Sequence, residues 1–426
     1  MNLLFPELYT EIFKYLSIRY VKSELSTINK NFANIIYDLD FVDFDLNGLE
    51  GVTDIDLSEL TNLIKLDLGD NKIITNQGIT DLLNLTCLNL NGNLNITNQG
   101  IENLTNLTKL TMGFNGNITD QGITNLTNLT DLTLCIEYNN NKVLIADQGI
   151  KHLVNLTSLN LTTNTVITGQ GIKNLTNLKM LNLDRNRLVG DQGIENLTNL
   201  EYLGLGVRKI ITEHDVLNFN KVITDKGFKN LTNLTDLWLG DSRRITNEGI
   251  KSLVKLRNLG LGDNTRITNE GIKPLINLER LHLGDLNYNF TDLGTVTNLT
   301  YLSLGRCLNV TNLFISNLTN LTDLDLGSSQ YITDEGIINL VNLTKVYLGN
   351  NPIHITDQGI SNLTNLTDLH LGSNRVITDQ GISKLTNLTK LVLGGNEIIT
   401  NQGISNLTRL RYIRPCANRK VTKRFR

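Results

Sequence analysis

The residues best suited to catalysis or metal binding are few and widely spaced in this sequence. Five histidines show no spacing typical of a metal site, and four cysteines include no Cys-x-x-Cys pair. The sequence has no phosphate-binding loop, no His-Glu-x-x-His motif and no nucleophile elbow. His282 and His370 stand at equivalent repeat positions that we expect to lie about 19 Å apart, too far to share one ion. We therefore expect no catalytic residue, no metal ligand, no cofactor and a protein that is not an enzyme.

Composition and charge argue against several other classes of protein. The formal net charge of −3 disfavours general binding to nucleic acid or to a membrane surface, and no apolar stretch approaches the length of a membrane span. The N-terminus lacks the pattern of a signal peptide. Repeated Asn-Leu-Thr triplets, such as Asn103 to Thr105, would carry glycans in a secretory compartment. We therefore expect an intracellular, cytoplasmic protein, in the host cell if the source is a virus, and leave a nuclear location open.

A repeat of mostly 22 residues runs along nearly the whole chain. Its pattern is L-x-x-L-x-L-G-x-N-x-x-I-T-D-Q-G-I-x-N-L-T-N. The first leucine stands at positions 63, 85, 107, 129, 156, 178, 200, 234, 256, 278, 299, 321, 343, 366, 388 and 410. A degenerate first copy begins at Phe41, which gives about 17 strand positions. Because each copy packs only on its neighbours, we expect one continuous core along the array.

Each part of the repeat has a physical function in such a stack. The alternation in L-x-x-L-x-L predicts a strand with Leu66 in the core and with Lys65 and Asp67 facing solvent. The following asparagine, such as Asn71, is expected to bond the buried backbone groups of adjacent coils. The threonine of I-T-D-Q-G-I predicts the N-cap of a short helix. Glycine costs about 1 kcal/mol inside a helix, so its recurrence there indicates close packing between coils.

These repeats resemble those of the leucine-rich-repeat family over roughly residues 41 to 413. The I-T-D-Q-G-I half is similar to the subclass common in F-box proteins. The resemblance implies an α/β fold, a horseshoe-shaped solenoid with a parallel concave sheet and short convex helices. It also implies that the concave surface holds another protein.

The N-terminal segment does not fit the repeat and predicts two amphipathic helices. Leu8, Ile12 and Leu16 lie four residues apart on one face of the first helix, which starts after Pro6. The second helix carries an apolar face that includes Phe32. The order and spacing of these residues resemble the F-box, in which the position of Phe32 is usually tryptophan.

The F-box resemblance implies a partner, a Skp-type adaptor of a cullin-based ubiquitin ligase. It also implies the adaptor-binding residues, namely Pro6, Leu8, Ile12 and Leu16. The repeats would then hold an unknown protein substrate. An alternative remains open, because two helices at this place would also serve as a cap over the first apolar coil.

Larger side chains gather at solvent-facing strand positions in the later repeats. Early repeats carry small polar residues there, whereas the later ones carry aromatic, histidine and arginine residues. The candidate substrate-binding residues are Tyr202, Trp238, Arg280, His282, Tyr301, Tyr347 and His370. Exposed tryptophan, tyrosine and arginine are favoured at the centres of protein interfaces. Random drift of solvated positions is the alternative explanation.

We therefore divide the chain into an F-box-like domain at residues 1–38, a solenoid at 39–414 and a basic tail at 415–426. Two lengthened repeats, within residues 129–156 and 200–234, either flank the binding face or are tolerated insertions. The repeat at Leu278 lacks the Gln-Gly-Ile signature, which predicts a local irregularity. The function expected is substrate recognition for an F-box ubiquitin ligase. A free-standing binding scaffold or inhibitor, which could also regulate an enzyme by covering its active site, is the alternative.

Overall fold

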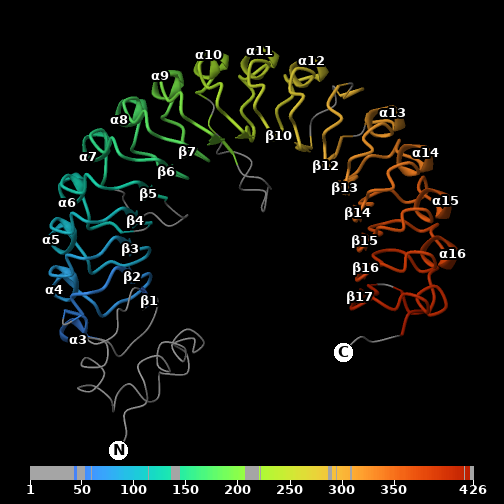
Figure 1. Cartoon of the computed structure of the whole chain (residues 1–426), viewed down its shortest axis with the longest axis horizontal. Coiled ribbons are helices and arrows are strands. Elements are labelled where there is room, and N and C mark those ends of the chain that lie inside the picture. Colours follow the sequence, from blue (N-terminus) through green and yellow to red (C-terminus); the bar gives the residue numbers. More distant parts are fainter. Residues whose placement is uncertain are drawn as a thin grey trace, which may run out of the picture. The chain divides into compact units, whose positions relative to one another are not determined.

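The computed structural model describes residues 43–45, 53–58, 60–113, 115–135, 144–206, 220, 222–285, 290–293, 295–307, 309–416 and 418–422. The F-box-like segment and the inserted parts of both lengthened repeats lie outside these residues, so the predictions made for them stay predictions. The chain divides into two compact units, here called unit 1 and unit 2, between Leu200 and Glu201. In each unit the strands line the inner side of a curve and the helices its outer side (Figure 1).

The strands follow the 22-residue period. In unit 1 they are β1 (Asp43–Asp45), β2 (Lys65–Asp67), β3 (Cys87–Asn89), β4 (Lys109–Thr111), β5 (Asp131–Thr133), β6 (Ser158–Asn160) and β7 (Met180–Asn182). In unit 2 they are β8 (Tyr202–Gly204), β9 (Asp236–Trp238), β10 (Asn258–Gly262), β11 (Arg280–Leu283), β12 (Tyr301–Ser303), β13 (Asp323–Asp325), β14 (Lys345–Tyr347), β15 (Asp368–His370), β16 (Lys390–Val392) and β17 (Tyr412–Arg414). The described chain therefore has a strand at each of the 17 predicted positions.

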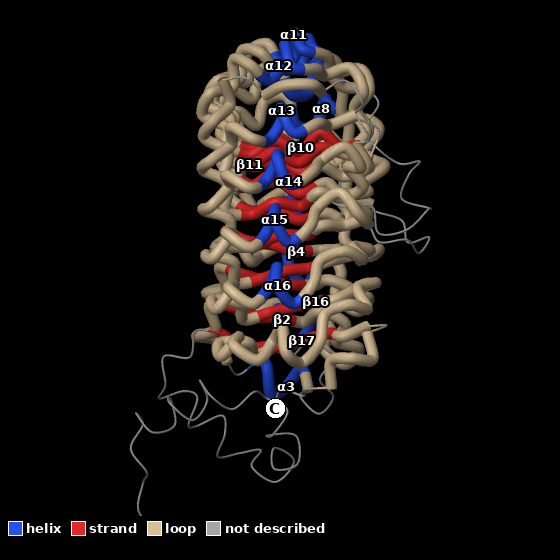
Figure 2. Tube along the Cα trace, turned by 90° about the vertical axis from the view of Figure 1, so that its right-hand side faces the viewer, coloured by secondary structure: helices blue, strands red, loops and turns tan. Residues whose placement is uncertain are grey.

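Most repeats continue into one short helix on the outer side. In unit 1 the helices are α3 (Asp54–Ser58), α4 (Asn76–Ile79), α5 (Asn98–Ile101), α6 (Asp120–Ile123), α7 (Asp147–Ile150), α8 (Gly169–Ile172) and α9 (Asp191–Ile194). In unit 2 they are α10 (Asp225–Phe228), α11 (Asn247–Ile250), α12 (Asn269–Ile272), α13 (Asn312–Ile315), α14 (Asp334–Ile337), α15 (Asp357–Ile360) and α16 (Asp379–Ile382). Helices α13 to α16 stand in single file on the outer side of unit 2 (Figure 2). None of the helices in the described residues combines the length and apolar character that a membrane crossing needs.

Parallel pairing keeps equivalent residues side by side. Within unit 1, Leu66 of β2 is in register with Leu88 of β3, and the same relation continues strand by strand. Within unit 2, Leu324 of β13 is in register with Val346 of β14. These central strand residues are at most 2% exposed, so each unit has one continuous apolar core.

Buried asparagines join consecutive coils as the sequence predicts. Asn93 donates from Nδ2 to the Asn71 carbonyl at 2.9 Å, and its Oδ1 accepts from the backbone N–H groups of Asn95 and Ile96 at 3.0 Å. Asn264 repeats the arrangement in unit 2 by donating to the Ser242 carbonyl at 2.9 Å. These bonds satisfy the polar backbone that the turn brings into the core.

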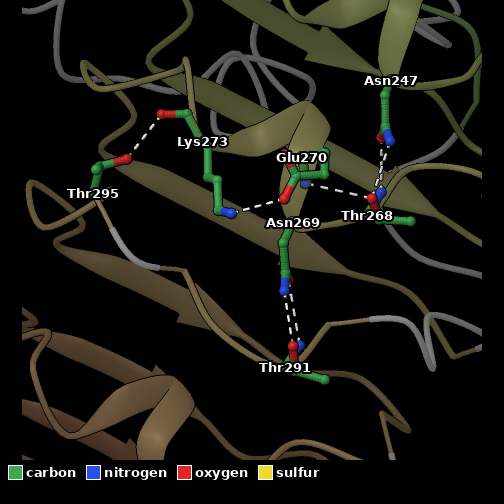
Figure 3. A network of polar contacts seen from close by, with 7 residues as sticks. All are labelled: Asn247, Thr268, Asn269, Glu270, Lys273, Thr291 and Thr295. Atoms are coloured by element: carbon green, nitrogen blue, oxygen red, sulfur yellow. Dashed lines mark hydrogen bonds and ion pairs between the residues drawn. The ribbon is translucent and has the colours of Figure 1, made fainter.

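A second ladder links the helix starts on the outer side. The residue after the capping threonine accepts from the next coil, as where Asn247 Oδ1 receives the Thr268 backbone N–H at 2.9 Å and Asn247 Nδ2 donates to Thr268 Oγ1 at 3.0 Å. Figure 3 shows this pair and the next, in which Asn269 bonds Thr291. Where the residue is aspartate, both carboxylate oxygens accept: Asp334 receives the Thr356 N–H at 2.8 Å and hydroxyl at 2.6 Å. Thr356 also caps its own helix by accepting from the Gln358 N–H.

The repeat between β11 and β12 is irregular, as its sequence predicts. No helix occurs in its described residues. In the following helix α13, Phe314 replaces the glycine of other repeats, and its ring lies 6.4 Å from that of Phe290 in an edge-to-face arrangement. Both rings are buried. Two phenylalanines therefore fill the core at the repeat that lacks a helix.

Candidate functional site

The inner face of unit 2 carries all seven candidate substrate-binding residues. The first and third residues of each strand point away from the core, and we call them the first and third strand positions. Tyr202, Arg280 and Tyr301 occupy first positions of β8, β11 and β12. The third positions of β9, β11, β14 and β15 hold Trp238, His282, Tyr347 and His370.

A change in the turn after the strand explains why only unit 2 has large side chains at third positions. In unit 1 these residues close the turn, as where Asn160 Oδ1 accepts the Thr162 backbone N–H at 3.0 Å. The left-handed residue of this turn stands three residues after the third strand position, at Thr163 with a φ of 58°. Asp67, Asn89 and Asn182 make the equivalent bond. These four small polar residues of unit 1 therefore stabilise turns.

In unit 2 glycines take over the turn. They stand two residues after the third position and have left-handed φ values of 53° to 58° at Gly240, Gly262, Gly305, Gly327, Gly349, Gly372 and Gly394. A Cβ atom on Gly349 would overlap the Gly327 carbonyl, so only glycine fits this stack. The glycine lets the turn form with tryptophan, histidine or tyrosine at the third position, although Asp325 still accepts the Gly327 N–H at 3.0 Å.

Four residues form what we call the aromatic stack: Trp238, Arg280, His282 and Tyr301. The ring centroids of Trp238 and His282 lie 4.8 Å apart, and those of His282 and Tyr301 lie 4.5 Å apart. The Arg280 guanidinium carbon lies 4.1 Å from the Tyr301 ring centroid, within cation–π distance. Burial raises the pKa of the Tyr301 hydroxyl, Asp325 adds to the rise, and Arg280 opposes it.

The expectation that Trp238 is exposed is wrong. Its side chain is almost wholly buried, with 5% of the residue exposed. A Cβ atom on Gly260 of the next strand would overlap the Trp238 ring, so the indole lies directly on that glycine. Trp238 is thus a support for His282, and the parts of the stack that a partner can reach are Arg280, which is exposed, and the half-buried His282 and Tyr301.

A second cluster surrounds His370. Its ring centroid lies 4.3 Å from that of Tyr347, and its Nε2 lies 2.9 Å from Asp368 Oδ1. Burial lowers the pKa of His370 below 6.5, although Asp368 acts in the opposite direction. Burial also raises the pKa of Tyr347, and Asp368 adds to that rise.

The sequence reasoning missed the charged first positions beside these rings. Lys345 Nζ lies 3.0 Å from Asp323 Oδ1, and Lys390 Nζ lies 3.4 Å from Asp368 Oδ2. The Asp323 hydrogen bond, followed by its charge, raises the pKa of Lys345. Aspartate and lysine alternate along β13, β14, β15 and β16 at the first position. This alternation of aspartate and lysine at the repeat spacing is the sequence signal that could have predicted the ion pairs.

The other predicted residues stand apart from these clusters. Tyr202 is half-buried on β8, in register with Asp236 of β9. Pro6, Leu8, Ile12 and Leu16 lie outside the described residues, whereas residues 415, 416 and 418–422 of the basic tail lie within them. Among the described residues, no three His, Cys, Asp or Glu side chains are grouped to hold a metal ion.

This stacking of short strands and helices defines a leucine-rich-repeat solenoid. A family model described as Leucine Rich repeat matches residues 59–83, 103–126, 152–175, 317–341, 362–386 and 384–407, so the chain contains leucine-rich repeats. No curated protein matches the sequence.

Several solved structures are similar to this chain. A leucine-rich-repeat protein of Leptospira interrogans is 26% identical, with a TM-score of 0.61 over 90% of this chain and 97% of that one. An internalin of Listeria monocytogenes is 25% identical, with a TM-score of 0.49 over 90% of this chain and 94% of that one. TLR13, in a complex with the RNA ssRNA13, is 23% identical, with a TM-score of 0.49 over 84% of this chain and 63% of that one.

Proposed function

We propose that this chain is a protein-binding solenoid that recognises its partner on the inner face of unit 2. The observation that carries the proposal is the stack of Trp238, His282, Tyr301 and Arg280, whose side chains support one another at strand positions that the turns do not need. Fixed aromatic and arginine side chains lose little conformational entropy on binding, which is why they dominate interface energetics. The protein is not an enzyme, and it needs neither a metal nor a cofactor.

A more specific proposal, called the finer proposal below, concerns the cellular role of the chain. Residues 1–38 resemble an F-box, so the chain is proposed as the substrate-recognition subunit of a Skp–cullin–F-box ubiquitin ligase. Residues 39–414 hold the substrate, and residues 415–426 form a basic tail. Such a protein is proposed to act inside the cell, in the cytoplasm, with a nuclear location left open.

A pull-down of the full chain with a purified Skp-type adaptor tests the finer proposal. The double variant Ile12→Asp, Leu16→Asp should lose binding, because it places two charges on the proposed contact face. Lys14→Ala, on the opposite face of the same predicted helix, should bind like wild type. Unchanged circular dichroism and melting of all three proteins exclude unfolding.

Absence of adaptor binding by the wild-type chain would reject the ligase role. The alternative would then hold, in which residues 1–38 only cap the solenoid and the protein is a free-standing scaffold or inhibitor. The proposal that unit 2 binds a protein partner does not depend on this result.

A further inference from the structure

Arg280 is held in one place on the inner face of unit 2. Its guanidinium lies over Tyr301, whose ring contacts His282, which in turn contacts the buried Trp238. Trp238 itself rests on the bare backbone of Gly260. Arg280 is exposed, so the support comes from one side while solvent reaches the other.

Arg280 differs from the neighbouring lysines in its charge balance. Lys345 and Lys390 face Asp323 and Asp368 at 3.0 and 3.4 Å. In the described part of unit 2, no carboxylate forms an ion pair with Arg280, although Asp236 and Asp323 stand two strands away at first positions on either side. Asp236 accepts from Asn258 Nδ2 at 2.7 Å. Arg280 is therefore a fixed cation whose N–H groups are available to a ligand.

From this geometry we propose that the inner face of unit 2 docks a segment of its partner through a single carboxylate, which Arg280 binds. The inference rests on the proposed function and names the chemistry of the partner. Guanidinium groups bind carboxylates through two parallel hydrogen bonds, and a guanidinium held by a ring loses less entropy in doing so. The aspartates two strands to either side limit the site to one carboxylate, and they favour a partner with basic residues flanking its acidic one.

Two carboxylate sources share this chemistry, an aspartate or glutamate side chain and a chain terminus. Three synthetic peptides separate them. The first carries one glutamate flanked by lysines and has both ends blocked, the second replaces the glutamate by glutamine, and the third is the glutamine peptide with a free C-terminal carboxylate. Trp238 is the only tryptophan of the chain, so its fluorescence reports on the stack directly.

We expect the glutamate peptide to change the Trp238 emission at concentrations where the blocked glutamine peptide does not. Arg280→Gln should weaken that binding roughly 10-fold or more, as the loss of a charged hydrogen-bonded pair predicts. Lys345→Gln is the matched control, because it removes a neighbouring cation that is already balanced, and it should change affinity by less than about 3-fold. Binding of the third peptide instead of the first would assign the site to a chain terminus.

The inference is overturned if neither carboxylate peptide binds more tightly than the blocked glutamine peptide. It is also overturned if Lys345→Gln weakens binding as much as Arg280→Gln, since the attraction would then be general electrostatics. Arg280→Gln should retain wild-type melting and adaptor binding, because Arg280 is exposed and far in sequence from residues 1–38. A negative peptide result therefore does not affect the proposal of adaptor binding, and a negative adaptor result does not affect the proposal for Arg280.

Discussion

At the scale of single residues, the hydrogen bonds between consecutive helix starts explain why glycine recurs in the helices. The Asp334 carboxylate receives two bonds from Thr356, and it occupies the space in which a Cβ atom on Gly359 would lie. The recurring glycine is therefore required by the aspartate or asparagine of the preceding coil. The sequence predicted close packing between coils, but it did not identify this side chain as the neighbour.

Gly359→Ala is expected to destabilise the protein, although alanine is normally the better helix former. The methyl group must displace Asp334 and disrupt its bonds to Thr356, which should cost about 1–3 kcal/mol. Urea unfolding followed by circular dichroism measures the change. Gly395→Ala is the control, because its Cβ would meet only ordinary contacts, the nearest at 3.6 Å. Equal effects of the two substitutions would contradict the explanation.

His370 gives a prediction about pH. Burial holds its folded pKa below the ordinary value of 6.5, so the folded protein binds fewer protons than the unfolded chain just below that pH. Stability should therefore fall as the pH drops from about 6.5 toward the folded pKa. His370→Gln should lose less stability over the same interval. An imidazole NMR titration of His370 with a midpoint at or above 6.5 would refute the prediction.

At the scale of elements, the repeat between β11 and β12 shows how the core adapts to a missing helix. Phe314 stands where other repeats have glycine and packs against Phe290. Phe314→Gly restores the repeat pattern and yet should destabilise the protein by about 3–5 kcal/mol, because it leaves a cavity. Leu313→Gln also restores the pattern, at a residue that is 64% exposed, and should change stability by less than about 0.5 kcal/mol. Urea unfolding of both variants decides whether packing or agreement with the repeat sets the stability here.

The repeat period was sufficient to predict the elements but not the contacts of the site. Leucines at fixed spacing determine where strands lie, because only one register buries them all. The burial of Trp238 depends instead on Gly260 one coil later, and a pattern averaged over repeats does not show such a pair. The lysine and aspartate pairs were missed for the same reason, since they join residues about one repeat apart.

At the scale of the whole molecule, the two units apply one repeat in two ways. Four turns of unit 1 are closed by side chains from the strand face, whereas the turns of unit 2 use left-handed glycines, to which Asp325 adds the same side-chain bond. The backbone bonds of the turn change direction as well. Thr163 N–H donates to Asp184 of the following coil, but Ser373 N–H donates to Gly349 of the preceding one. Third strand positions whose side chains bond the turn, four in unit 1 and Asp325 in unit 2, therefore contribute to stability, whereas the glycine turns after Trp238, Tyr347 and His370 accommodate large side chains.

This division predicts opposite outcomes for substitutions at equivalent positions. Asn160→Ala removes the acceptor for the Thr162 N–H and hydroxyl, at 3.0 and 2.7 Å, and should cost about 1–2 kcal/mol. Val392→Thr, at the third position of β16, keeps the β-branched shape where the turn uses Gly394, and should cost less than about 0.5 kcal/mol. Thermal and urea unfolding of each variant give the two values. If Val392→Thr proved as costly as Asn160→Ala, third positions would be structural in both units, and the assignment of recognition to unit 2 would lose its physical basis.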